Sequence, residues 1–176
     1  MKIFKRILAL SILFLSFGAI AQNNDDHRVM DDADTAKSIL IEKDSSIDSF
    51  FSDSAGYVIF PNVGKGGLII GASAGNGVLY EHGVAQGMAK LKKLSVGLQA
   101  GGQAITEVIF FEDEAALASF KDGDFEFAAG VSAVVLKSGK AKEAKYKDGV
   151  AVFALPKAGL MAEASVGGQK FSYHAF

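Results

Sequence analysis

The chain of 176 residues contains no cysteine and no tryptophan, and only two prolines and three histidines. The lack of cysteine excludes disulfide frameworks, thiolate zinc sites, cysteine nucleophiles and lipid attachment through a cysteine. Its 20 glycines follow no three-residue period, which together with the scarcity of proline excludes a collagen-like chain. Glycine still exceeds its usual share of about 7%, so the positions of the glycines need an explanation.

The chain contains one long apolar run, residues 7–20, which follows three basic residues within residues 1–6. Ala19 and Ala21 then form a small-residue cleavage site, an arrangement typical of a secretory signal peptide. A retained membrane anchor is the alternative, but the run is short of the roughly 20 residues that a spanning helix needs. We therefore predict a signal peptide over residues 1–21 and an exported protein, located in the periplasm or associated with the envelope.

Cleavage after Ala21 would leave 15 basic and 20 acidic residues, a net charge of −5. Nucleic-acid-binding proteins generally present a basic surface, so this balance argues against a nucleic-acid partner. Residues 22–33 are polar and acidic, and we predict that they form a flexible leader. Residues 34–176 are then expected to fold as a single domain.

Apolar residues recur after the leader at steps of three and four, which is the spacing of a helix that buries one face. We predict an amphipathic helix from Asp34 to Phe51, loosened around Ser45-Ser46, with acidic residues at its start. A second, shorter helix is predicted over Glu112–Phe120, opened by acidic residues and ended near Gly123.

The remaining sequence alternates apolar and small residues, most clearly over Gly67–Tyr80 and Leu94–Phe111. Glycines inside such strands mark bends or close backbone approach, so long glycine-striped strands indicate a curved sheet. Further strands are predicted over Gly56–Pro61, where Pro61 ends the strand, and over Phe125–Val135, Gly149–Leu155 and Ala158–Tyr173. The sequence thus predicts an α+β fold: a strongly curved, glycine-rich, half-barrel-like antiparallel sheet with an N-terminal amphipathic helix and a short second helix.

Four segments together resemble the SYLF domain, a family of lipid-binding domains found in eukaryotes and in exported bacterial proteins. They are Ser54–Gly83, Ser95–Phe120, Asp124–Val135 and Val150–Tyr173. The most specific parts are the run through Phe60-Pro61 into the glycine-rich strand and the alternating motif that begins at Ser95 (SVGLQAG). The chain departs from the family between Gly83 and Leu94, where the family often has a Trp-x-x-Pro-like stretch and this chain has GVAQGMAKLKK. The resemblance implies a non-enzymatic role at membrane lipid, and for an exported bacterial protein we expect anionic phospholipid as the partner.

Four lysines are the predicted lipid-binding residues. Lys90, Lys92 and Lys93 cluster ahead of the strand that begins at Leu94, and Lys65 lies in an earlier turn. Each lysine close to an anionic surface contributes about 1 kcal/mol, so three or four would support weak attachment to head groups. A second basic cluster, residues 137–147, is diluted by acidic residues. The alternative is that both clusters are solvated and keep edge strands from pairing with other chains.

Catalytic motifs are missing from the sequence. His27, His82 and His174 have no metal-ligand spacing around them, and Gly64-Lys65-Gly66-Gly67 lacks the remainder of a phosphate-binding loop. We therefore predict no catalytic residue, no metal and no cofactor. Two further functions stay open: a periplasmic module that binds an envelope protein through an open sheet edge, and a small outer-membrane β-barrel. The polar register of the last residues argues against the barrel.

Overall fold

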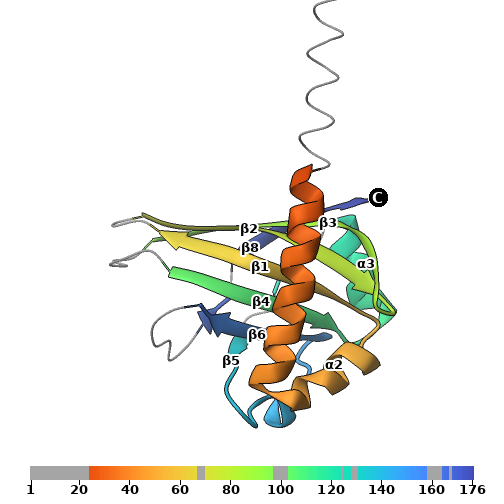
Figure 1. Ribbon diagram of the computed structural model, residues 1–176. Helices are drawn as coiled ribbons and strands as arrows, with labels where there is room; N and C mark the ends of the chain where they lie inside the picture. The colour runs from red at the N-terminus through yellow and green to blue at the C-terminus, as the bar shows by residue number, and fades with distance from the viewer. Residues whose placement is uncertain are drawn as a thin grey trace, which may run out of the picture.

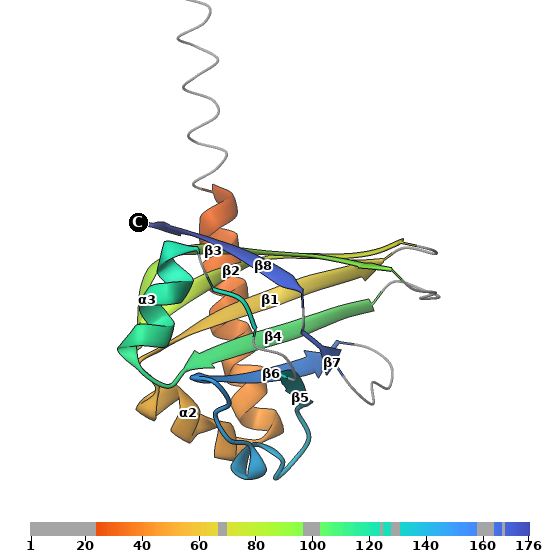
Figure 2. The same cartoon turned by 180° about the vertical axis from the view of Figure 1, so that it is seen from behind.

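The computed structural model describes residues 24–66, 70–96, 103–123, 125–127, 131–157, 164–166 and 168–176. A long helix crosses one face of a twisted sheet (Figure 1), and a shorter helix, α3 (Glu114–Asp122), covers part of the other face (Figure 2). The predicted signal peptide lies outside the described residues. Within those residues, no helix is both long and apolar enough to cross a membrane.

Eight strands form the sheet, in the order β7-β5-β6-β4-β1-β2-β3-β8. After a helix over residues 24–43, the elements are η1 (Ser45–Ile47), α2 (Asp48–Asp53), β1 (Gly56–Gly66), β2 (Ile70–Glu81), β3 (Val84–Val96), β4 (Gln103–Phe111), α3 (Glu114–Asp122), β5 (Ser132–Val135), η2 (Ala141–Glu143), β6 (Val150–Pro156), β7 (Ala164–Ser165) and β8 (Gln169–Ala175). The fold is α+β as predicted, but the sheet is mixed rather than antiparallel, because β5 and β6 run parallel. The long connection from β5 to β6 allows this, since parallel neighbours need a crossover of a dozen or more residues. The sheet is not closed, and β7 and β8 are its two ends.

The N-terminal helix (residues 24–43) extends further upstream than the sequence predicts. Residues 24–33, expected to belong to a flexible leader, are helical, so that prediction is wrong for them. The reason is that the buried stripe already includes Val29 and Ala33, which pack against the sheet. The helix stops before Asp44, and η1 and α2 follow, which confirms the predicted loosening around Ser45-Ser46.

Small side chains bring this helix close to the sheet. Ala33, Ala36 and Leu40 are buried against a cluster that includes aromatic residues of β1, β2, β4 and β6. Two hydrogen bonds between the helix and the strands also fix the orientation of the helix on the sheet. Tyr80 Oη donates a hydrogen bond to Asp34 Oδ1 at 3.0 Å, and Lys37 Nζ donates to the hydroxyl of Tyr57 at 3.1 Å. We call this side of the sheet the helix face.

The opposite face of the sheet holds a second core beneath α3. Its aromatic members are Phe60, Phe111, Phe120, Phe125 and Phe171, with Phe127 and Tyr173 packed against them. The ends of α3 agree with the prediction from sequence. The carboxylate of Asp113 accepts a hydrogen bond from the amide of Ala116 at 2.9 Å, and Gly123 ends the helix with a φ of 80°.

The strand predicted over Phe125–Val135 is shorter in the structure, where β5 covers Ser132–Val135 and residues 125–127 are not in a strand. Three further strand predictions are wrong, and each error has a physical cause. The single strand expected over Leu94–Phe111 is divided between β3 and β4, which β1 and β2 separate in the sheet. The strand expected over Ala158–Tyr173 is likewise divided between β7 and β8, at opposite ends of the strand order. Alternation of small and apolar residues does not mark where a chain leaves one strand and enters another. Finally, Pro61 does not end β1, because the register with both neighbouring strands shifts around it and the irregularity accommodates the proline.

A contact between distant strands reveals how strongly the sheet bends. Gln169 of β8 donates from Nε2 to Oε2 of Glu107 in β4 at 3.0 Å, although β1, β2 and β3 lie between these strands. In a flat sheet, four steps of about 4.8 Å would separate the two strands by about 19 Å, too far for a direct contact. The sheet therefore curls toward the face that α3 covers. The half-barrel description stays a prediction.

Candidate functional site

Three of the four predicted lipid-binding lysines lie within β3 rather than in a loop. The turn His82-Gly83 has positive φ at both positions, 49° and 79°, which is the geometry of a two-residue hairpin, so β3 begins directly at Val84. Successive side chains of a strand point to opposite faces. Lys90 and Lys92 therefore lie exposed on the helix face, whereas Lys93 lies on the opposite face with the buried Ala89 and Leu91.

Lys65, the fourth predicted lysine, is in β1 rather than in a turn. Its backbone is in register with Ser73 of β2, which is itself opposite Lys93 of β3. Lys65 thus belongs to the cross-strand row of Lys93, not to the rows of Lys90 and Lys92. The structure does not unite the four predicted residues in one site.

A lysine that sequence reasoning missed completes a different group. Lys170 of β8 lies directly opposite Lys92, while Lys90 lies opposite Ser172. All three lysines are exposed. Directly opposed residues have Cβ atoms about 4.5–5.5 Å apart, and like charges in that position destabilise a sheet. We call Lys90, Lys92 and Lys170 the lysine row. The only sequence signal for Lys170 is its alternation with the apolar Phe171, which places it on the outer side of a strand without naming its neighbour.

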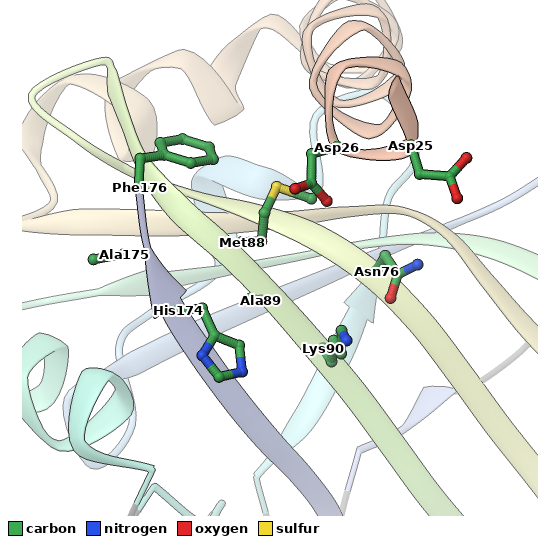
Figure 3. Close-up of a pocket in the computed structure, with 9 residues that line it drawn as sticks. All are labelled: Asp25, Asp26, Asn76, Met88, Ala89, Lys90, His174, Ala175 and Phe176. Atoms are coloured by element: carbon green, nitrogen blue, oxygen red, sulfur yellow. The ribbon is translucent and has the colours of Figure 1, made fainter. Parts of the chain in front are cut away.

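A cavity of about 530 Å³ lies beside the lysine row, between the first described turn of the N-terminal helix and strands β2, β3 and β8. Its lining is Asp25, Asp26, Asn76, Met88, Ala89, Lys90, His174, Ala175 and Phe176. In Figure 3 the helix brings Asp26 over Met88, while Lys90 and His174 extend from the strands. Asp25 pairs with Arg28 of its own helix at 3.1 Å, and none of the ion pairs found in the described ranges joins this helix to the strands. The cavity therefore presents acidic and basic groups that do not neutralise each other by direct contact.

The second basic cluster, residues 137–147, is held in place by a buried carboxylate. Asp44 Oδ2 accepts from the amide of Ala141 at 2.8 Å, and Asp44 Oδ1 accepts from the hydroxyl of Ser46 at 2.6 Å. Burial alone would raise the pKa of Asp44, but these hydrogen bonds outweigh burial and lower the pKa to about 2. Within the cluster, Lys140 also pairs with Glu143 at 2.8 Å. This cluster therefore wraps the end of the N-terminal helix and is partly neutralised, unlike the lysine row.

The three histidines come from three different elements: the N-terminal helix, the β2–β3 turn and β8. Across the described ranges, no group of three or more histidine, aspartate or glutamate side chains is arranged to hold a metal ion.

Comparison with known proteins agrees with the resemblance seen in the sequence. Residues 92–175 match the Ysc84 family, described as "Las17-binding protein actin regulator". Over 141 residues the chain is 30% identical to the "Beta cell expansion factor A" of Aeromonas veronii, an alignment that covers 79% of this chain and 53% of that relative. The chain thus spans about half the length of this relative. Both Lys92 and Lys170 lie inside the segment that matches the family. These matches agree with the resemblance to the SYLF domain, since the chain is similar to the Ysc84, or SYLF, family over residues 92–175.

Proposed function

We propose that this protein is an exported lipid-binding domain that associates with membrane surfaces containing anionic phospholipid. The observation that carries the proposal is the lysine row, in which Lys92 and Lys170 face each other across β3 and β8 with Lys90 beside them. Like charges directly opposite each other cost a sheet up to about 1 kcal/mol. The phosphate groups of an anionic membrane would offset that cost by attracting the lysines, which supports a role for the lysine row in membrane binding.

The size of the expected effect follows from the number of lysines. Each lysine close to an anionic surface contributes about 1 kcal/mol, so the three lysines together would raise affinity by roughly 100-fold over a neutral membrane. Asp25 and Asp26 lie at the neighbouring cavity and oppose this attraction. We therefore expect weak, salt-sensitive attachment, because exposed charges are screened at moderate ionic strength.

Co-sedimentation of the purified protein with vesicles tests the proposal. We expect pelleting with vesicles of phosphatidylcholine and phosphatidylglycerol at low salt, less at moderate salt, and little with phosphatidylcholine alone. The double variant Lys90→Glu/Lys92→Glu should lose most of this binding. The matched control Lys142→Glu/Lys145→Glu makes the same charge change at exposed lysines of the second basic cluster and should retain most of it. If both double variants lost vesicle binding equally, the loss would depend only on net charge. That result would overturn the specific role of the lysine row.

Export is part of the proposal and rests on the pattern of residues 1–21. The expected finding is a protein that begins at Gln22 in the fraction released by osmotic shock, identified by the mass of the intact chain. A protein found only in the cytoplasmic fraction would contradict export, whereas the lipid-binding proposal would still be tested by the vesicle experiment.

A second candidate function is the binding of an envelope protein by strand addition. Strand β8 supports it, because β8 is the last strand in the sheet order and its outer edge faces no other described strand. Failure of the protein to pellet with vesicles of any composition would favour this function over lipid binding.

A further inference from the structure

A second groove, of about 430 Å³, runs along the N-terminal helix at the ends of β4 and β6. Strands β1 and β2 separate this part of the sheet from β3 and the lysine row. The groove is lined by Asp32, Thr35, Ala36, Ile39, Lys43, Thr106, Leu155, Pro156 and Lys157. Its volume falls within the range of small-molecule sites, about 300–1,000 Å³.

The middle of the groove is apolar and open. Ile39 is 47% exposed, one of three large hydrophobic side chains so exposed in the described part of the chain. Leu155 and Pro156 of β6 are only partly buried and line the same groove. The hydroxyl of Thr106 already donates to the carbonyl oxygen of Pro61 at 3.1 Å, so it needs no polar group from a ligand. An apolar chain over Ile39, Leu155 and Pro156 would therefore leave the Thr106 hydroxyl with its hydrogen bond.

The two ends of the groove differ in charge. At one end, Asp32 accepts a hydrogen bond from Asn62 at 3.1 Å, and Asn62 in turn accepts one from Lys157. These polar groups satisfy one another. At the other end, Lys43 is exposed and takes part in no hydrogen bond or ion pair recorded for the described residues. The apolar channel thus ends at Lys43, a cation with no partner recorded among the described residues, whereas Lys157 at the other end is linked through Asn62 to the carboxylate of Asp32.

We propose that this groove binds a medium-chain fatty acid, with the hydrocarbon chain over Ile39, Leu155 and Pro156 and the carboxylate at Lys43. The helix residues that line the groove run from Asp32 to Lys43. These 11 steps correspond to about 16 Å of helix, close to the length of an extended chain of about 12 carbons. Charge and length therefore favour the same ligand. The site is separate from the lysine row and does not depend on membrane association.

Titration calorimetry with sodium dodecanoate, decanoate and octanoate, each below its micelle-forming concentration, tests the proposal on the purified full chain. Because burial of each methylene changes affinity by up to about fourfold, removal of two carbons should weaken binding by up to about 15-fold. No binding of dodecanoate, or equal affinity for the three acids, would overturn the proposal.

Two variants locate the site. Ile39→Glu places a carboxylate in the channel and should weaken dodecanoate binding at least tenfold, and Lys43→Gln should weaken it several-fold by removing the cation. Val84→Glu is the matched control, because Val84 is 62% exposed on β3, away from the groove. Circular dichroism verifies that each variant is folded. If Ile39→Glu does not fold, Lys43→Gln still tests the site, because Lys43 is an exposed helix residue whose substitution should not disturb folding. The double variant Lys90→Glu/Lys92→Glu should bind dodecanoate like the parent, which separates this site from the lysine row. Unchanged affinity in Lys43→Gln and in folded Ile39→Glu would overturn the assignment.

Discussion

Gly77 provides the sharpest test of how closely β1 and β2 approach each other. A Cβ added at Gly77 would lie 2.5 Å from the carbonyl oxygen of Ile59 and 2.6 Å from Cδ1 of Phe60. Both Ile59 and Phe60 are fully buried in β1, so the backbone oxygen cannot move aside without disturbing the centre of the sheet. Gly64 is the matched control, because a Cβ there meets nothing within 4 Å. Neither glycine has a positive φ, so alanine is compatible with the backbone conformation at both positions.

The magnitude follows from two opposing effects. Replacing glycine by alanine lowers the entropy of the unfolded chain and stabilises a protein by about 0.4–1 kcal/mol where the new methyl group fits. Forcing a methyl group into a packed interior costs about 1–3 kcal/mol. Gly77→Ala should therefore lower the free energy of unfolding by about 1–2 kcal/mol, and Gly64→Ala should raise it by up to about 1 kcal/mol. For a domain of this size, each kcal/mol moves Tm by about 2–4 °C, so the two Tm values should move in opposite directions.

Thermal unfolding followed by circular dichroism, together with urea titration at 25 °C, measures both changes. We expect Tm to fall by about 2–8 °C in Gly77→Ala and to rise by up to about 4 °C in Gly64→Ala. A Gly77→Ala protein as stable as the parent would refute the close approach of β1 and β2. Equal destabilisation in both variants would show that the loss comes from strand preference and not from this contact.

Three further predictions concern buried polar groups. Asp44→Asn should lower the free energy of unfolding by about 1–2 kcal/mol at pH 7. The folded-state pKa of Asp44 is about 2, below its ordinary 3.8. The difference in unfolding free energy from the parent, measured by urea titration, should therefore shrink as pH falls from 4 toward 2. A difference that stays constant over that range would contradict the assignment. The hydrogen bond from Tyr80 to Asp34 should give a coupling of about 1 kcal/mol in a double-mutant cycle of Tyr80→Phe and Asp34→Ala, and zero coupling would count against it. Burial raises the pKa of Tyr146 to about 12, so Tyr146→Phe should remove an ultraviolet component that titrates near pH 12; loss of a component near pH 10 instead would be inconsistent with burial.

Local signals in the sequence were sufficient to predict where several helices begin or end. Asp113 and Gly123 bracket α3 as their residue types predict, since an aspartate side chain can cap the first turn and glycine tolerates the positive φ at the end. The serine pair after Asp44 likewise marked the end of the long helix. These features depend on a few neighbouring residues, which the sequence displays directly.

Long-range pairing was beyond the reach of the sequence. Nothing near Lys92 indicates that β3 pairs with β8, so the predicted cluster included Lys93, which faces the opposite side of the sheet, and omitted Lys170. The acidic residues around Ala33 suggested a flexible leader, but burial of that alanine against the sheet outweighs the polarity of its neighbours. In both cases the outcome depends on tertiary contacts that residue periodicity does not contain.

The hydrogen bonds that the Asp44 carboxylate accepts have a consequence for the order in which contacts form during synthesis of the chain. One of the hydrogen-bond donors, the amide of Ala141, lies 97 residues further along the chain. A nascent chain that has reached only β4 contains the helix and its terminal aspartate, but not this donor. The hydrogen bond from Ala141 therefore cannot form until synthesis has passed residue 141, whereas the local bonds from Ser46 can form earlier. A chain truncated before residue 141 would therefore contain the N-terminal helix without the loop that secures its end.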